Sequence, residues 1–259
     1  MRHVPRLLIA IAAFALVSAS CGSDSSNSNT TTSPVTGDIT VLAAASLTAA
    51  YTEMGNAFKT VHPGANVVLS FGASSALVTQ INEGAPADVF ASADQSNMTK
   101  LTDSGNNAGG PQVFATNSLQ IIVGKGNPKG ITAVADLAKP DLLYVTCAPE
   151  VPIGKYAAQV LTAANVTVTP VSFEQNVKGI VTKVTAGEAD AGIVYKTDVI
   201  AAGSAAAGVD IPADINVTAT YPVVVIKKAP NPLGAQAFVD FVLSDQGQTI
   251  LASYGFTAP

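Results

Sequence analysis

The chain has 259 residues, with 13 Lys and Arg against 18 Asp and Glu and only two cysteines. Both arginines lie in the first six residues, so the rest carries 11 lysines against those 18 acidic residues, a net charge of −7. A nucleic-acid partner requires a basic patch, and none is visible in this sequence. An anion bound here must be held mainly by neutral donors.

The first 20 residues have the features of a secretory signal peptide. A basic start is followed by an uninterrupted apolar run over 7–17 and then by small residues, the order typical of an export signal. The run is shorter than the roughly 20 apolar residues that a membrane-spanning helix needs. We therefore predict a signal peptide at 1–20; the alternative is a buried N-terminal helix, which the polar segment after it would separate from any core.

Cys21 stands where a bacterial lipoprotein signal places its modified cysteine. Small residues flank it, although Ser18 occupies the position where the lipobox prefers Leu or Val. We predict that lipid on Cys21 anchors the exported protein to the outer face of the cell membrane; the alternative is ordinary cleavage and a soluble secreted protein. Residues 21–37 are rich in Ser, Thr and Asn and read as a flexible linker. Cys147 is then left without a disulfide partner, and we expect it to be buried.

Strand and helix patterns alternate along the rest of the chain. Short apolar runs favour strands at 39–43, 67–71, 88–91, 119–123, 142–147, 191–195 and 221–226. Apolar residues at helical spacing favour helices at 47–59, 76–83, 132–137, 153–164, 177–186, after Pro232, and at 246–253. A strand–helix–strand order predicts an α/β fold with mainly parallel sheets covered by helices.

Two strand ends carry a serine after small residues. Ser46 follows the strand at 39–43 and Ser74 follows the strand at 67–71, each at the predicted N-cap of a helix. Hydroxyls and free helical N–H groups at the carboxyl edge of a parallel sheet form a donor-rich pocket, and ligands bind at this edge in open α/β sheets. The alternative is that each serine only caps its own helix.

Three further positions offer donors. The segments at 149–156 and 176–178 each open a predicted helix, whose first backbone N–H groups have no partner within the helix. Tyr195 ends the strand at 191–195, so its hydroxyl can project into a cleft. The alternative is a tyrosine that packs at the end of a sheet.

Several segments together resemble the periplasmic molybdate-binding proteins of bacterial ABC importers. They are ITVLAAASLTAAY, SFGASSALVTQINEGAPADVFASAD, PEVPIGKYAAQVL, ADAGIVYKTDV and the ending YGF, and they span nearly all of 38–256 in order. The resemblance implies a type II periplasmic-binding-protein fold, in which two α/β lobes enclose the ligand in the cleft between them. It implies lobe 1 at 38–118 plus 225–259 and lobe 2 at 119–224.

The same resemblance implies a function and a set of site residues. The protein would capture molybdate or tungstate with high affinity and deliver it to the permease and ATPase of an ABC importer. It would act as a monomer, without a cofactor and without catalysis. The oxyanion would be held by hydroxyls and backbone N–H groups of Ser46 and Ser74, by the backbone N–H groups of Ile153 and Val177, and by the hydroxyl of Tyr195. Asp88 and Asp94 would brace a strand end and not touch the anion.

Other ligands and other functions remain as alternatives. A site made only of donors favours a fully deprotonated dianion, because the proton of a hydrogen phosphate needs an acceptor; sulfate is a dianion too, so only size can exclude it. Small organic anions and ferric iron are further candidates. A Ser-His-Asp hydrolase would need His62, and the chain has neither a G-x-S-x-G motif nor His/Cys metal-ligand spacing. A surface adhesion module would bind no small molecule.

Overall fold

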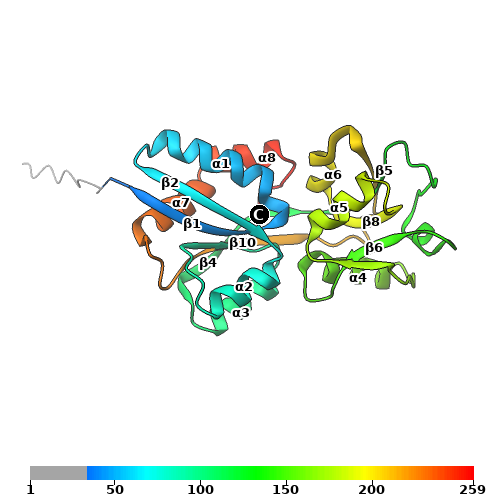
Figure 1. Cartoon of the computed structure of the whole chain (residues 1–259), viewed down its shortest axis with the longest axis horizontal. Coiled ribbons are helices and arrows are strands. Elements are labelled where there is room, and N and C mark those ends of the chain that lie inside the picture. The colour runs from blue at the N-terminus through cyan, green and yellow to red at the C-terminus, as the bar shows by residue number, and fades with distance from the viewer. Residues whose placement is uncertain (1–33) are drawn as a thin grey trace, which may run out of the picture. The chain divides into compact units, whose positions relative to one another are not determined.

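The computed structural model describes residues 34–259, so the predicted signal peptide and Cys21 lie outside the described residues. The described chain forms two five-stranded sheets flanked by helices (Figure 1). The first sheet has the order β2-β1-β3-β10-β4, with β1 (Gly37–Ala44), β2 (Ala65–Gly72), β3 (Val89–Ala91), β4 (Asn107–Asn117) and β10 (Ala219–Ile226). The second has the order β7-β6-β8-β5-β9, with β5 (Leu119–Gly124), β6 (Tyr144–Cys147), β7 (Ser172–Glu174), β8 (Ala191–Tyr195) and β9 (Ala206–Asp210). The predicted two-lobed α/β fold is therefore confirmed.

The helices lie between the strands along the chain, and each belongs to one of the two lobes. Those of the first lobe are α1 (Thr48–Val61), α2 (Ser74–Asn82), α3 (Gln95–Asp103), α7 (Pro232–Leu243) and α8 (Asp245–Ser253). Those of the second lobe are α4 (Pro152–Ala163), α5 (Val177–Thr185) and α6 (Lys196–Ala202). Short 3-10 helices lie at η1 (Ala45–Leu47), η2 (Val134–Ala138) and η3 (Gly203–Ala205). Within residues 34–259, none of these helices is long and apolar enough to cross a membrane.

Both sheets are mixed, and both share one plan. In the first, β1 pairs in parallel with β2 and β3, whereas β10 runs antiparallel to β3 and β4. In the second, β6 pairs in parallel with β7 and β8, whereas β5 runs antiparallel to β8 and β9. We predicted mainly parallel sheets, but parallel pairing is confined to one half of each sheet, β2-β1-β3 and β7-β6-β8. The antiparallel half carries the segments that connect the lobes.

The first sheet is buried on both faces, which explains its nearly continuous apolar strands. Alternate residues of β1 enter different clusters: Val41 packs with the aromatic side chains of α1 and α7, and Leu42 packs with α2 and α3 on the other face. The first of these clusters includes Phe58 and Phe238, whose rings meet edge to face at 5.5 Å. This core fixes the carboxyl ends of β1 and β2, where the predicted serines lie.

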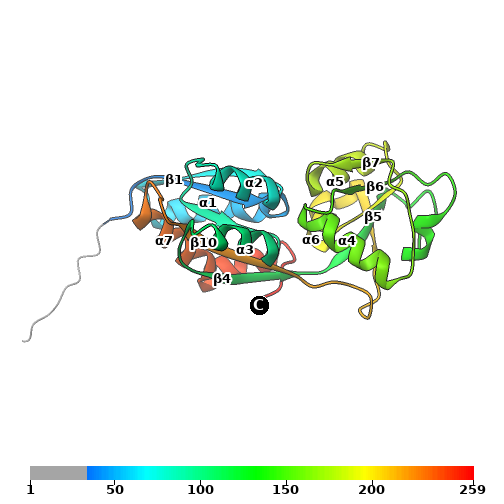
Figure 2. The same ribbon diagram turned by 90° about the horizontal axis from the view of Figure 1, so that it is seen from below.

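Two crossings connect the lobes. The first is almost continuous, because β4 ends at Asn117 and β5 begins at Leu119 (Figure 2). The second runs from the end of β9 to β10, and β10 pairs with the first sheet from Ala219 onward, six residues before the predicted return to lobe 1 at 225. The side chain of Asn216 holds the two crossings together, because it accepts from the backbone N–H of Leu119 at 3.2 Å and donates to its carbonyl at 3.0 Å.

Five elements were absent from the sequence prediction, namely α3, β4, β7, α6 and β9. Helix α3 is largely polar, and only Asn97, Met98 and Leu101 are buried. Strand β4 contains Gly-Gly-Pro and is exposed over its first half, so its composition resembles a loop. Both elements form through pairing or packing with distant segments, which periodicity does not reveal.

Candidate functional site

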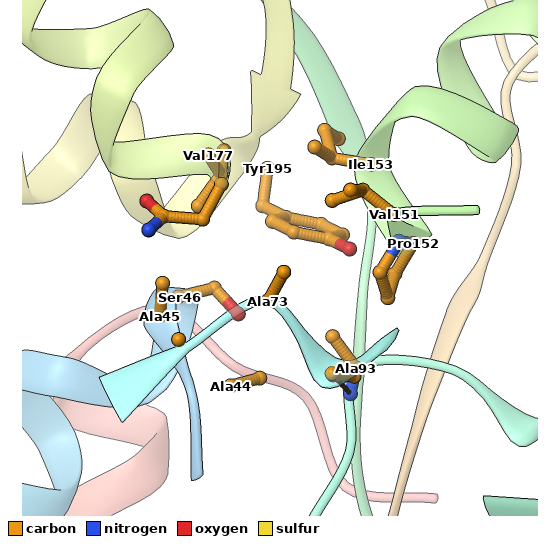
Figure 3. A pocket seen from close by; sticks show the side chains of 13 residues that line it. Ala44, Ala45, Ser46, Ala73, Ala93, Val151, Pro152, Ile153, Val177 and Tyr195 are labelled. Atoms are coloured by element: carbon orange, nitrogen blue, oxygen red, sulfur yellow. Dashed lines mark hydrogen bonds between the residues drawn. The ribbon is translucent and has the colours of Figure 1, made fainter. Parts of the chain in front are cut away.

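All five predicted site residues line one pocket between the two lobes (Figure 3). The space in the pocket that is not filled by atoms is about 210 Å³, part of it open to solvent. Figure 3 shows Ser46 and Ala73 on the side of the first lobe, facing Val177, Tyr195 and Ile153 of the second. The complete lining is Ala44, Ala45, Ser46, Gly72, Ala73, Ser74, Ala93, Val151, Pro152, Ile153, Asn176, Val177 and Tyr195. Its size suits a small ligand.

Neither serine caps its own helix, so the predicted N-cap role is wrong. Ser46 lies inside η1, and the N-cap of α1 is Leu47; Ser74 is the first residue of α2, and its N-cap is Ala73. Both serines are buried, and their hydroxyls bond elsewhere. Because they satisfy no helix end, the capping alternative does not explain why serines stand at the ends of β1 and β2.

Among the described residues, the hydroxyl of Ser74 acts only as a hydrogen-bond acceptor. Its oxygen accepts a hydrogen bond from the backbone N–H of Ala93 at 3.0 Å, which joins the start of α2 to the segment after β3. A serine hydroxyl can accept and donate at once. Ser74 lines the pocket and donates to no group among the described residues, so its proton is available to a ligand there.

Tyr195 has a buried hydroxyl without a hydrogen-bond partner among the described residues. The residue is 2% exposed, and an unpaired buried hydroxyl costs ~1–3 kcal/mol. Burial raises the pKa of Tyr195 well above its usual value, and the neighbouring tyrosines and carboxylates raise it further. Tyr195 therefore remains a neutral phenol and presents a donor to the pocket.

Two helices of the second lobe begin at the pocket. Helix α4 starts with Pro152 after Val151, which provides no side-chain cap. Helix α5 starts at Val177, and its N-cap Asn176 accepts from Lys178 N–H at 3.0 Å, so the N–H of Val177 is left free. Helix starts whose first N–H groups are free carry partial positive charge and favour an anion.

Gly154 allows α4 to start close to the end of β6. A Cβ atom at this position would lie 2.4 Å from the carbonyl oxygen of Cys147 and 2.2 Å from that of Ala148. The backbone of the first turn, with the N–H of Ile153, can therefore approach the strand end only because residue 154 has no side chain. Cys147 itself is buried as predicted, and burial raises the pKa of its thiol to about 12.

No charged side chain belongs to the pocket lining. The nearby carboxylates are paired with lysines: Asp198 is fully buried and bonds the Nζ of Lys178 at 2.8 Å, and Asp94 lies 3.7 Å from the Nζ of Lys155. Burial raises the pKa of Asp198, and the Lys178 charge opposes that rise. The pocket thus offers donors in a neutral environment.

Asp88 and Asp94 brace the first lobe, as predicted. Asp88 accepts from the backbone N–H of Thr40 at 2.7 Å and from that of Asn231 at 2.6 Å, which joins β1 to the start of α7. Asp94 caps α3 by accepting from the N–H of Asn97 at 3.1 Å. Neither carboxylate lines the pocket.

His62 lies far from the serines. It follows the last residue of α1, whereas Ser46 lies just before that helix, whose 14 residues span roughly 21 Å. His62 packs instead on Phe58, with ring centroids 4.5 Å apart. Within residues 34–259, no three His, Cys, Asp or Glu side chains form a group that could hold a metal ion.

Sequence reasoning missed Tyr221. Its hydroxyl lies 3.0 Å from that of Ser46, although the residues are 175 positions apart, and its ring packs 5.8 Å from that of Tyr195. Tyr221 lies inside an apolar strand, where a tyrosine is an ordinary core residue. No local signal could have linked it to the site.

Comparison with known proteins places the chain in a family. The bacterial extracellular solute-binding protein family matches residues 39–257. The molybdate-binding protein ModA of Mycobacterium tuberculosis (strain H37Rv) is 41% identical over 241 residues, which cover 92% of this chain and 92% of that protein.

Two solved structures show the same fold. The periplasmic molybdate-binding protein of Azotobacter vinelandii matches with a TM-score of 0.76 at 22% identity, over 85% of this chain and 99% of that one. The sulfate-binding protein SubI of Mycobacterium tuberculosis matches with a TM-score of 0.76 at 20% identity, over 85% and 86%. The fold is thus shared by binders of different oxyanions, and the chain belongs to the bacterial extracellular solute-binding protein family.

Proposed function

We propose that this protein captures molybdate or tungstate outside the cytoplasm and delivers it to the permease and ATPase of an ABC importer. The observation that carries the proposal is the pocket itself. Two serine hydroxyls, a tyrosine hydroxyl without a partner among residues 34–259 and two helix starts with free N–H groups converge there, and no charged side chain of the described residues lines it. The 41% identity to a protein named molybdate-binding protein supports the choice of anion.

The proposed contacts are the five that the resemblance implies. Ser46 and Ser74 donate from the first lobe, the N–H groups of Ile153 and Val177 donate from the second, and Tyr195 donates its hydroxyl. Because the donors come from both lobes, the anion stabilises the arrangement in which the lobes approach each other. A permease that recognises this arrangement would distinguish loaded protein from empty protein.

A donor-only pocket favours a fully deprotonated tetrahedral dianion. Hydrogen phosphate would place a proton against donors and leave it without an acceptor, at a cost of ~1–3 kcal/mol. Sulfate carries the same charge as molybdate, so the shorter bonds of sulfate must be what reduces its contact with the ring of donors. Binding of another oxyanion such as sulfate, or of a small organic anion, is the second candidate.

Ferric iron and catalysis fit the pocket less well. Iron sites use several phenolate, imidazole or carboxylate ligands, whereas the pocket lining has one tyrosine and no histidine or carboxylate among the described residues. Hydrolysis by a triad would need a histidine beside a serine, and His62 lies at the far end of α1. We therefore propose a binding protein that is not an enzyme, needs no cofactor and acts as a monomer.

The cellular location belongs to the same proposal. Capture for an importer requires export, which the signal features at 1–20 would provide. We propose that lipid on Cys21 tethers the protein to the outer face of the membrane through the linker at 21–37. Metabolic labelling with a palmitate analogue tests this: label that is lost in Cys21→Ala supports lipidation, and an unlabelled, released protein contradicts it.

Thermal unfolding with molybdate, tungstate, sulfate or phosphate in excess tests the ligand. A ligand that binds only the native state adds about 2.7 kcal/mol of stability at 100 times its dissociation constant. We expect large shifts in melting temperature with molybdate and tungstate, little with sulfate, and their loss in Ser46→Ala/Ser74→Ala. Equal shifts with sulfate would identify a general oxyanion binder. No shift with any anion would contradict the proposed ligand.

A further inference from the structure

We infer that Tyr221 is a positioning residue for the ligand, acting through Ser46. The inference rests on the proposed binding of an oxyanion in this pocket. Tyr221 does not line the pocket, but its hydroxyl oxygen lies 3.0 Å from that of Ser46, which does. By donating to the Ser46 oxygen, Tyr221 directs the proton of Ser46 toward the bound anion. It thereby helps to make the pocket a site of donors only.

The surroundings of Tyr221 hold its hydroxyl in place. The residue is fully buried in β10, and its ring packs edge to face on Phe114 at 6.2 Å and on Phe256 at 5.3 Å. Burial raises the pKa of Tyr221 well above its usual value, so the phenol keeps its proton. The ring cannot swing away without opening the core, and its O–H has to find an acceptor nearby.

The direction of the hydrogen bond follows from the partners available. The hydrogen bond that the structure gives the Tyr221 hydroxyl is the one with Ser46, at 3.0 Å. The proton of Tyr221 then has the oxygen of Ser46 as its acceptor. A phenol is also a stronger donor than an aliphatic alcohol, since it is the more acidic of the two. The proton of Ser46 is consequently free for the pocket.

This arrangement bears on which anions are accepted. A serine hydroxyl that turns freely can donate to a dianion or accept from the O–H of a hydrogen phosphate. With the Tyr221 proton on its oxygen, Ser46 is biased toward donation, and a protonated oxyanion meets a donor where it needs an acceptor. Tyr221 therefore favours deprotonated dianions without touching them.

Isothermal titration of the full chain with molybdate and with inorganic phosphate tests this role. We expect Tyr221→Phe to weaken molybdate binding about tenfold, the magnitude of one neutral hydrogen bond. Phosphate affinity should fall less or rise, so that the preference for molybdate over phosphate becomes smaller. An equal loss for both anions would indicate a general structural defect and overturn the inference.

A double-mutant cycle identifies Ser46 as the intermediary. In the Ser46→Ala background, Tyr221→Phe should change molybdate affinity less than about twofold, because the group through which it acts is absent. Additive losses would overturn the inference. Tyr51→Phe is the matched control: Tyr51 is equally buried and packs on the same Phe114 at 5.8 Å, but its hydroxyl has no partner and it does not line the pocket. It should leave both affinities unchanged.

A second measurement covers the case in which Tyr221→Phe folds poorly. Incorporation of 3-fluorotyrosine labels the six tyrosines of the otherwise unchanged chain. The ¹⁹F resonance that Ser46→Ala shifts in the ligand-free protein should shift again when molybdate is added to the wild type. A resonance that responds to Ser46→Ala but not to molybdate would overturn the inference. A wild-type chain that binds no oxyanion would refute the proposed function, and this inference with it.

Discussion

Single hydroxyl groups account for most of the binding chemistry at the residue scale. Ser74 accepts from the N–H of Ala93, Ser46 shares a hydrogen bond with Tyr221, and Tyr195 has no partner among residues 34–259. Each arrangement leaves a donor that is already oriented before a ligand arrives. Pre-oriented groups lose less conformational entropy on binding than mobile ones, and this favours high affinity.

Tyr195→Phe should change binding and stability in opposite directions. Removing the hydroxyl deletes a donor to the ligand, so we expect molybdate affinity to fall by a factor of ~10–100, corresponding to ~1–3 kcal/mol. The ligand-free protein should be as stable as the wild type or more so, because an unpaired buried hydroxyl disappears. Calorimetric titration and urea unfolding measure the two effects. Unchanged affinity would remove Tyr195 from the set of contacts.

Helix starts and the contacts between helices matter at the element scale. Helices α2, α4 and α5 begin at the pocket, so each contributes unpaired N–H groups to it. A polar contact outside the pocket also joins the lobes: the Nζ of Lys155 on α4 lies 2.9 Å from the Ser96 hydroxyl and 3.7 Å from the Asp94 carboxylate on the α3 side. This contact exists only while the lobes are together.

Lys155→Met should therefore weaken ligand binding without touching the ligand. An ion pair with an exposed lysine is worth ~0–1 kcal/mol, so we expect a loss of up to about fivefold in molybdate affinity. The stability of the ligand-free protein should hardly change. Lys139→Met is the control, because Lys139 pairs with Asp136 at 3.0 Å within one lobe. Equal effects of the two substitutions on affinity would argue against a contribution to lobe closure.

Buried tyrosines link the stability of the whole molecule to alkaline pH. Five tyrosines are buried, and burial raises the pKa of each; that of Tyr144 rises to about 12. In the unfolded chain a tyrosine titrates near ~10. Above that pH the unfolded state loses protons that the folded state keeps, so stability falls until the folded pKa values are reached.

The free energy of unfolding should accordingly be steady below about pH 10 and fall above it. Each buried tyrosine adds up to ~1.4 kcal/mol per pH unit to the slope. Urea unfolding at about pH 9, 10, 11 and 12 measures this fall in the free energy of unfolding. Tyr51→Phe should reduce the slope by one proton, which separates the tyrosines from lysine titration. A free energy that is flat through this range would contradict the burial of these hydroxyls.

The sequence alone determined the alternation of strands and helices and the positions that face the pocket. Apolar periodicity places Ser46 and Ser74 after two strands and predicts the two later helix starts, because these are properties of short segments. The choice of Ile153 and Val177 within those starts came from the family resemblance. Edge strands such as β4 were missed, since their composition resembles a loop until β10 pairs with them. The serines were also assigned to helix caps, because local sequence cannot distinguish a cap from a strand-end hydroxyl.

Only the tertiary structure decided how those hydroxyls are used. The fold brings the Tyr221 hydroxyl within 3.0 Å of that of Ser46, although the two residues are 175 positions apart. It also lets the N–H of Ala93 donate to the Ser74 hydroxyl, and it pairs Lys155 of one lobe with Asp94 of the other. Local propensity is set by neighbours within a few residues, whereas the direction of a buried hydrogen bond depends on every donor and acceptor that packing brings within 3–3.5 Å. The sequence could therefore predict a pocket of donors, and the fold decided which protons point into it.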